Sequence, residues 1–198
     1  MRYLLALVCL LLPSVSLAQV NTLGVYTEDG PAALCSTADT PGPHTLYVMV
    51  RLGSGVTGAS FRIEHSSGFT GTLLSSSSPW LNVTGDPSTG VTVMFDNTCQ
   101  FDCPVMTLNY MFVGGSPDCS WIRTAKNPQL PGGGPAISDC AFQWRIAYWE
   151  GTHVTSGDST DCRNDINYEE HTHFCRPYWE PTVATEASTW GAVKALYR

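Results

Sequence analysis

The chain has 198 residues, of which 43% are hydrophobic and 14% charged, and its formal net charge is -7. With 10 Lys and Arg against 17 Asp and Glu it repels phosphate groups, which argues against nucleic acid and anionic lipid as partners. The length is sufficient for one domain with a core of its own and short for two.

Residues 1–18 have the three parts of a secretory signal peptide. Arg2 supplies the positive charge, Leu4–Leu12 is an unbroken apolar run, and Ser16-Leu17-Ala18 has the small-x-small pattern that precedes cleavage. The apolar run is about half as long as the ~20 residues of a spanning helix, which favours a signal peptide over a retained membrane anchor. We therefore expect a mature chain that begins at Gln19, has no membrane span, and is secreted or held at the cell surface.

Alternation of apolar and polar residues with a period of two predicts β-strands along most of the chain. The main runs are Leu46–Leu52, Phe61–Glu64, Val91–Asp96, Met106–Phe112 and Phe142–Tyr148, and shorter ones are Leu23–Thr27, Gly71–Leu74 and Ser120–Thr124. Ser75–Ser78 is expected to form a loop. The prediction is an all-β, antiparallel two-sheet sandwich over residues 19–176, of jelly-roll or immunoglobulin/cohesin-like type, with a closed barrel as the alternative.

The cysteines indicate a domain stapled by disulfides, because an exported chain meets an oxidising compartment. Cys9 lies in the signal peptide, and the seven cysteines after it leave one thiol unpaired. Closure of a polar segment favours a bond between Cys162 and Cys175. By elimination, Cys119 is expected to pair with Cys140 and Cys35 with Cys99, which leaves Cys103 over; Cys103 can also replace Cys99 in this scheme.

Residues 177–198 form a linker and a distinct C-terminal motif. Ser188 or Thr189 is placed to cap a short helix, and cations near the end suit the helix dipole. An isolated eleven-residue helix is marginal in water, so this tail needs a surface on which to pack. That surface is either the sandwich itself or a sorting or anchoring receptor that reads the tail through its side chains, which are Trp190, Val193, Lys194, Leu196, Tyr197 and Arg198.

The segment Ser188–Arg198 resembles a C-terminal signature, Trp-Gly-x-(Ile/Val)-Lys-x-(Leu/Met)-(Tyr/Phe)-Arg, of small uncharacterised secreted bacterial β-sandwich proteins. The body resembles members of the same group at Gly24-Val25-Tyr26, Cys35, Gly58–Ile63 and Asn97–Gln100. The Gly-Ala-x-Phe-x-Ile pattern between alternating strands is also similar to cohesin-like sandwiches. The resemblance implies a bacterial surface or secreted recognition module and gives no reaction.

Two polar segments are candidate metal sites. In a strand, His171, His173 and Cys175 would share one face, and two imidazoles with a thiolate form a zinc-like set, against a solvated polar strand as the alternative. The second segment has oxygen ligands suited to calcium without EF-hand spacing, and a solvated acidic loop is the alternative. Its carboxylates are Asp158, Asp161 and Asp165.

No catalytic motif occurs in the sequence: there is neither a Gly-x-Ser-x-Gly nucleophile elbow nor a His-Glu-x-x-His zinc site. Exposed aromatic rings can stack on sugars, so the many Trp and Tyr residues allow a carbohydrate-binding module, although such rings more often cap a core. We expect a non-enzymatic structural or recognition domain that binds an unknown protein or glycan at the cell surface. A carbohydrate-binding module, and a metal protein or hydrolase without a recognisable motif, are the alternatives.

Overall fold

The computed structural model describes residues 21–29, 36–51, 55–96, 98–117 and 120–155. This part of the chain is built of β-strands, joined by turns and loops, with no helix among the residues described. The strands are β1 (Thr22–Tyr26), β2 (Ser36–Ala38), β3 (Gly42–Arg51), β4 (Val56–His65), β5 (Gly71–Ser77), β6 (Asn82–Asp86), β7 (Gly90–Met94), β8 (Cys103–Phe112), β9 (Ser120–Ala125), β10 (Ala136–Asp139), β11 (Trp144–Ile146) and β12 (Tyr148–Thr155).

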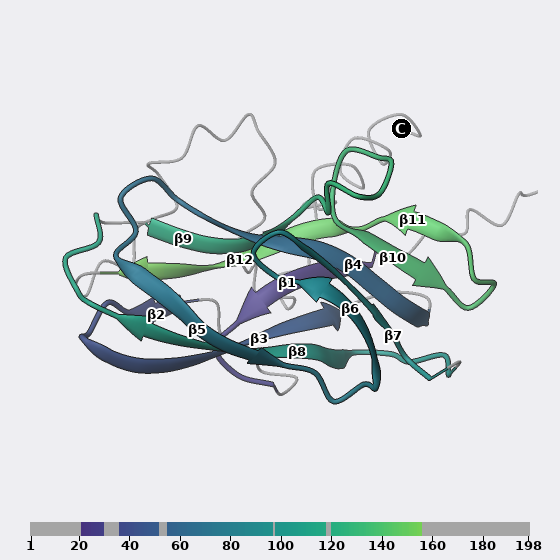
Figure 1. Cartoon of the computed structure of the whole chain (residues 1–198), viewed down its shortest axis with the longest axis horizontal. Coiled ribbons are helices and arrows are strands. Elements are labelled where there is room, and N and C mark those ends of the chain that lie inside the picture. The colour runs from purple at the N-terminus through teal and green to yellow at the C-terminus, as the bar shows by residue number, and fades with distance from the viewer. Residues whose placement is uncertain (1–20, 30–35, 52–54, 97, 118–119, 156–198) are drawn as a thin grey trace, which may run out of the picture.

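The strands form two facing layers (Figure 1). One layer has the order β1-β3-β8-β5, and the other contains β9, β4, β10 and β11 with β7 and β6 paired beyond β4. Strand β12 connects the layers, because its first half pairs with β1 and its second half with β9 and β2. The path of paired strands begins at β11 and ends at β5, so within the described residues the sheets form an open sandwich.

Nearly all pairings are antiparallel, and this confirms the predicted all-β sandwich. The exceptions are the two pairings of β12 with β1 and β2, which are parallel. A parallel neighbour requires a connection that crosses the fold. The sequence pattern did not predict these two pairings, since alternation reports only which side chains are buried.

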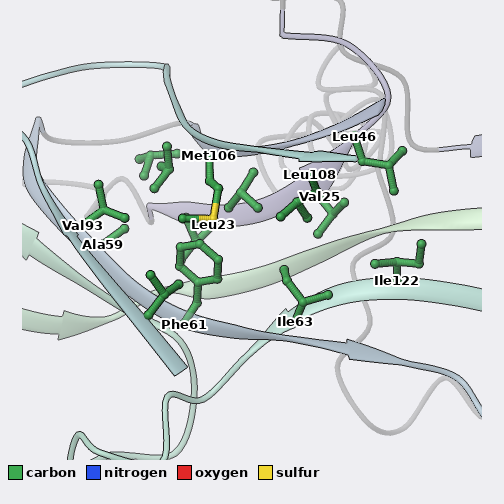
Figure 2. Packing of buried hydrophobic residues seen from close by; sticks show 14 of the residues in the cluster. Leu23, Val25, Leu46, Ala59, Phe61, Ile63, Val93, Met106, Leu108 and Ile122 are labelled. Atoms are coloured by element: carbon green, nitrogen blue, oxygen red, sulfur yellow. The ribbon is translucent and has the colours of Figure 1, made fainter. Parts of the chain in front are cut away.

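Apolar side chains from both layers meet in one core (Figure 2). The predicted inward residues of β3, β4, β7 and β8 are buried there, since alternate side chains of a strand point to one face. They include Leu46, Val48, Phe61, Val93, Leu108 and Tyr110. Burial of each such side chain contributes about 1.5–3 kcal/mol, and together they fix which face of each strand is internal.

Two predictions about strand boundaries are wrong. Residues Ser75–Ser77 belong to β5 and pair with β8, although they were expected in a loop. The run Phe142–Tyr148 is not one strand: Phe142 lies in a turn, β11 ends at Ile146, and β12 begins at Tyr148. Asp139 explains this reversal, because its Oδ1 accepts hydrogen bonds from the backbone N–H groups of Ala141 and Gln143, both at 2.9 Å.

The disulfide in the described region joins Cys99 to Cys140, which corrects the expected Cys35–Cys99 and Cys119–Cys140 bonds. Cys99 follows β7 and Cys140 follows β10, and both strands pair with β4, so their ends lie together with a Cα–Cα distance of 5.5 Å. The cysteines pair because their strands are neighbours of β4 in the sheet. Elimination along the sequence carries no information about which strands are neighbours. Cys103, which the expected pairing left over, is free and buried.

Candidate functional site

Several predicted site residues lie outside the described residues. They are His171, His173, Cys162, Cys175, Cys35, Cys119, Asp158, Asp161, Asp165 and the tail residues Trp190, Val193, Lys194, Leu196, Tyr197 and Arg198. In the part of the chain that is described, no three His, Cys, Asp or Glu side chains gather as a metal site. No helix among the described residues has the length and apolar character needed to cross a bilayer.

The β10–β11 hairpin turns at one end of the sandwich (Figure 1). Several apolar side chains on this hairpin and on the segment after the Cys99 disulfide are exposed. We call Phe101, Phe142, Trp144 and Ile146 the hairpin surface; they are 66%, 54%, 43% and 63% exposed. Isolated exposed apolar residues are ordinary on a protein, whereas several on neighbouring segments indicate a contact site.

The disulfide holds the two segments of the hairpin surface together. A Cβ atom placed on Gly55 would lie 2.9 Å from both the Phe101 ring and Cys140 Sγ, so the ring and the sulfur share one neighbour. Gln100 forms a backbone bridge to Val56, which also pairs with Asp139 at the start of the hairpin turn. Phe101 and the hairpin are thus anchored to the same end of β4.

Backbone strain is concentrated at the same end. The non-glycine residues with positive φ in the described segments are Asp96, Asp102 and Phe142, at 45°, 41° and 58°. Aspartate tolerates this left-handed region, but a bulky phenylalanine rarely occupies it. Such strain persists only where the surrounding structure enforces it, and it is enriched at binding and active sites. At Phe142 it places a large ring at the tip of the hairpin.

The outer edge of β11 has backbone groups available for pairing. Asp139 N–H donates to Gln143 O at 2.9 Å and Ala147 N–H to Pro135 O at 2.8 Å. Because alternate residues of an antiparallel strand face the partner strand, the N–H and C=O groups of Trp144 and Ile146 point away from β10. Strand β11 is the terminal strand of the path among the described residues. An edge of this kind can accept an added strand.

Electrostatics at the hairpin are dominated by Asp139. Its backbone hydrogen bond from Gln143, followed by the hydrogen bond from Arg145, holds the pKa of the Asp139 carboxyl below its usual range. Arg145 Nε lies 3.0 Å from Asp139 Oδ2. This ion pair neutralises the local charge, so the apolar side chains and the open backbone edge are the features that distinguish the surface.

The opposite end of the sandwich, where β8 finishes, contains a cluster of aromatic rings and two histidines. His65 Nε2 lies 2.8 Å from the Tyr110 hydroxyl, and the His65 ring stacks on Phe69 with centroids 5.0 Å apart. His44 stacks on Phe112 at 4.1 Å. Contacts with Phe69 and Tyr110 partly desolvate the His65 ring, and this lowers its pKa, while the neighbouring Glu64 acts in the opposite direction.

The arrangement of these histidines does not resemble a nucleophile–base pair. The hydroxyl groups near the His44 ring belong to Thr37 and Thr40, at 3.4 and 3.3 Å, and the hydroxyl at His65 belongs to Tyr110. Burial raises the pKa of the Cys103 thiol to about 12, which leaves it as an inert thiol. The hydrogen bonds of His44 and His65 involve no serine or cysteine side chain, so neither histidine is placed as a base beside a nucleophile.

The tryptophans considered as a sugar platform have different roles. Trp80 packs on Phe95 at 4.7 Å and donates from Nε1 to Pro104 O at 2.9 Å, so it belongs to the core edge. Arg123 covers the Trp121 ring at 4.3 Å. Trp144 is exposed, whereas Trp80 and Trp121 are half-buried. Trp179 and Trp190 lie outside the described residues.

Comparison with known proteins gives only a remote likeness. No protein-family model matches the chain, and no curated protein matches its sequence. A type II cohesin domain from the cellulosome of Acetivibrio cellulolyticus matches with a TM-score of 0.45 and 8% identity, over 69% of this chain and 95% of that one. A non-cellulosomal cohesin from the archaeon Archaeoglobus fulgidus matches with a TM-score of 0.45 and 8% identity, over 75% and 99%. These likenesses assign neither a family nor a partner.

Proposed function

We propose that this protein is a secreted or surface-attached recognition domain without catalytic activity, and that it binds a protein partner through the hairpin surface. The observation that carries the proposal is the exposure of Phe101, Phe142, Trp144 and Ile146 on two segments joined by the Cys99–Cys140 bond. Aromatic side chains are enriched at the energetic centres of protein interfaces.

The hairpin surface destabilises the free protein through its exposed apolar side chains and strained backbone, and this supports a binding role. A hairpin tip tolerates almost any small polar residue, yet this one has a phenylalanine in the left-handed backbone region. Burial of an aromatic ring against a partner removes a large apolar area from water. The disulfide fixes the surface before binding, which reduces the entropy lost on association.

A photo-crosslinking group placed at Ile146 tests the proposal, with Val113 as the matched control. Both residues are exposed and apolar, but Val113 follows β8 at the opposite end. We expect crosslinking of one particular protein from the Ile146 position and none from the Val113 position. Equal yields at the two positions would contradict a specific contact at the hairpin surface.

The crosslinked protein, once purified, allows a direct measurement of affinity. We expect Trp144→Ala and Phe101→Ala each to weaken its binding by about tenfold or more, as for central residues of an interface. Val113→Ala leaves the dissociation constant unchanged. An unaltered dissociation constant in both hairpin variants would refute the proposal even if the crosslink had formed.

A carbohydrate ligand is the second candidate, favoured by the exposed Trp144 ring. A glycan array distinguishes it from the first. Retention of the wild-type protein by a glycan, and loss of that binding in Trp144→Ala, would favour a carbohydrate-binding module.

The exported location and the C-terminal tail are part of the proposal. Deletion of Ala187–Arg198 separates the two roles of the tail when export and folding are measured independently. A protein that folds normally but is mislocalised indicates an address read by a receptor. A protein that reaches its normal location but melts several degrees lower indicates a structural brace.

A further inference from the structure

The two ends of the path of paired strands, β11 and β5, differ in how they are protected against an added strand. Native proteins block sheet edges with bulges, prolines or unpaired charges. Strand β5 has a register shift between Leu73 and Ser75 where it pairs with β8. Strand β11 pairs with β10 without such a shift, and its three residues include no proline. Of these two edges, β11 is therefore the one that can continue its sheet.

The backbone of β11 determines which kind of ligand fits along this edge. Arg145 pairs with Ile137 of β10 on the inner side of the strand. The N–H and C=O groups of Trp144 and Ile146 point away from β10, since successive residues of an antiparallel strand alternate in direction. They form a row of two donors and two acceptors that is about 7 Å long. The backbone of another extended chain is complementary to this row.

The side chains of β11 specify which residues the added segment needs. Trp144 and Ile146 share one face of the strand and are 43% and 63% exposed, so apolar residues opposite them would pack on these side chains. Arg145 lies on the other face, where its Nε donates to Asp139 Oδ2 at 3.0 Å. Among the described residues, this is the hydrogen bond that the guanidinium makes, and its two Nη groups remain able to bind a second carboxylate.

The charge of Arg145 argues against a second copy of this chain as the occupant. Two copies related by a two-fold axis would pair antiparallel along β11. The symmetric register that uses all four backbone groups places Arg145 opposite the same arginine of the other copy, with Cα atoms about 4.5 Å apart. Like charges directly opposite each other destabilise a sheet, whereas opposite charges stabilise it. Charge complementarity therefore favours a different chain that has an acidic residue at this position.

We propose that the hairpin surface binds its partner protein by strand addition, in which an extended segment with the pattern apolar–acidic–apolar pairs along β11. This inference rests on the proposed function and adds the conformation and composition of the bound segment. The backbone of Trp144 and Ile146 provides the hydrogen bonds, and Arg145 selects the acidic residue. Cys140 directly follows β10 and is bonded to Cys99, so the hairpin is held in place before the segment binds, which reduces the entropy lost on association.

A display library of random heptapeptides, selected on the full chain without its predicted signal peptide, tests the composition of the segment. Counter-selection uses Ile146→Pro, which removes an outward N–H and is compatible with an edge strand. We expect the enriched peptides to share the pattern apolar–acidic–apolar, and the preference for the acidic residue to disappear when Arg145→Gln is the bait. A library with no peptide enriched on the wild type over the proline variant overturns the proposal, as does a consensus without an acidic residue.

Backbone N-methylation of a selected peptide distinguishes strand addition from docking of side chains alone, and it leaves the protein unaltered. Methylation at residues whose N–H faces β11 is expected to weaken binding about tenfold or more, whereas methylation at the alternate residues changes the dissociation constant by less than about twofold. Ile146→Ala, which keeps the N–H, is the matched control for Ile146→Pro and is expected to have the smaller effect. Methylation effects that do not alternate along the peptide overturn strand addition.

Binding of the partner captured by crosslinking separates this inference from the proposed function. We expect Ile146→Pro to weaken that binding at least several-fold more than Ile146→Ala does. If Trp144→Ala weakens it but the proline and alanine variants are equal, the hairpin surface is the contact site and strand addition is wrong. If neither Trp144→Ala nor Ile146→Pro changes the dissociation constant, the proposed function itself fails.

Discussion

The two ends of β8 differ in how they use aromatic side chains. At the end where β8 finishes, Phe112 stacks on His44 and meets Phe69 edge to face, and Tyr110 is hydrogen-bonded to His65, so each ring supports another. At the end where β8 begins, Phe101 and Phe142 face solvent, and the backbone around them is strained. Rings at the first end are packed against one another and stabilise the fold, whereas rings at the second end are exposed and contribute little to stability. This contrast locates a binding surface better than the number of aromatic residues does.

The largest expected difference in unfolding free energy between the two ends is that between Phe112→Ala and Phe101→Ala. Phe112→Ala removes a fully buried ring from the aromatic cluster and is expected to cost about 3–5 kcal/mol of unfolding free energy. Phe101→Ala removes an exposed ring and is expected to change it by less than about 0.5 kcal/mol. Chemical denaturation of both variants measures the difference. Similar losses in the two variants would show that the hairpin end is as tightly packed as its counterpart.

Loss of the disulfide is expected to have the next largest effect on the unfolding free energy. Replacement of Cys99 and Cys140 by Ala is expected to cost about 2–4 kcal/mol, because their bond closes a loop with a sequence separation of 41. Reductant serves as the control: it lowers the stability of the wild type by more than that of the double variant, because the variant has already lost one of the bonds that reductant breaks. A wild type whose midpoint is insensitive to reductant contradicts this prediction.

Relief of backbone strain at Phe142 is expected to be stabilising. Phe142→Gly removes a left-handed penalty of about 1–2 kcal/mol, partly offset by the chain entropy of glycine, for a net gain of about 0.5–1 kcal/mol. Phe142→Ala is the matched control, because it removes the ring and keeps the strained φ. We expect the glycine variant to have the higher denaturation midpoint of the two. The reverse order would mean that the strain is not present in solution.

The smallest effect is a pH dependence from His65. Since desolvation lowers the pKa of its imidazole from 6.5, the unfolded chain binds more protons than the folded one just below that pH. Stability is therefore complete above pH 6.5 and falls as the pH decreases toward the folded pKa. His65→Gln keeps a polar partner for Tyr110 and removes the titration. Denaturation midpoints between pH 5 and 7 are expected to vary less in this variant than in the wild type.

The sequence predicted the strands whose side chains alternate between core and solvent. Strands β3, β4 and β8 were recognised because residues such as Val48, Phe61 and Leu108 recur at every second position and are buried. Alternation does not report where a strand reverses. The run that includes Trp144 continues without interruption in the sequence, but the chain turns at Asp139 and again changes partner at Ala147.

The candidate site depended on contacts between distant parts of the chain. The Cys99–Cys140 bond forms because β7 and β10 both pair with β4. The spacing of cysteines in the sequence does not reveal this shared neighbour. The one local signal was Asp139, whose hydrogen bonds to the next residues are typical of an aspartate at the start of a turn.

The position of β12 has a consequence for how the molecule is made. It is the last described strand in the chain, yet it lies between β1 and β9. A nascent chain that lacks it would leave β1 without one of its neighbours and the two layers without their hydrogen-bonded connection. The sheet therefore depends on contacts between distant parts of the chain and is completed only after β12 has been synthesised, and such non-local pairing is typical of slow-folding β-sandwiches. Truncation before residue 148 is expected to yield an aggregation-prone fragment with open strand edges.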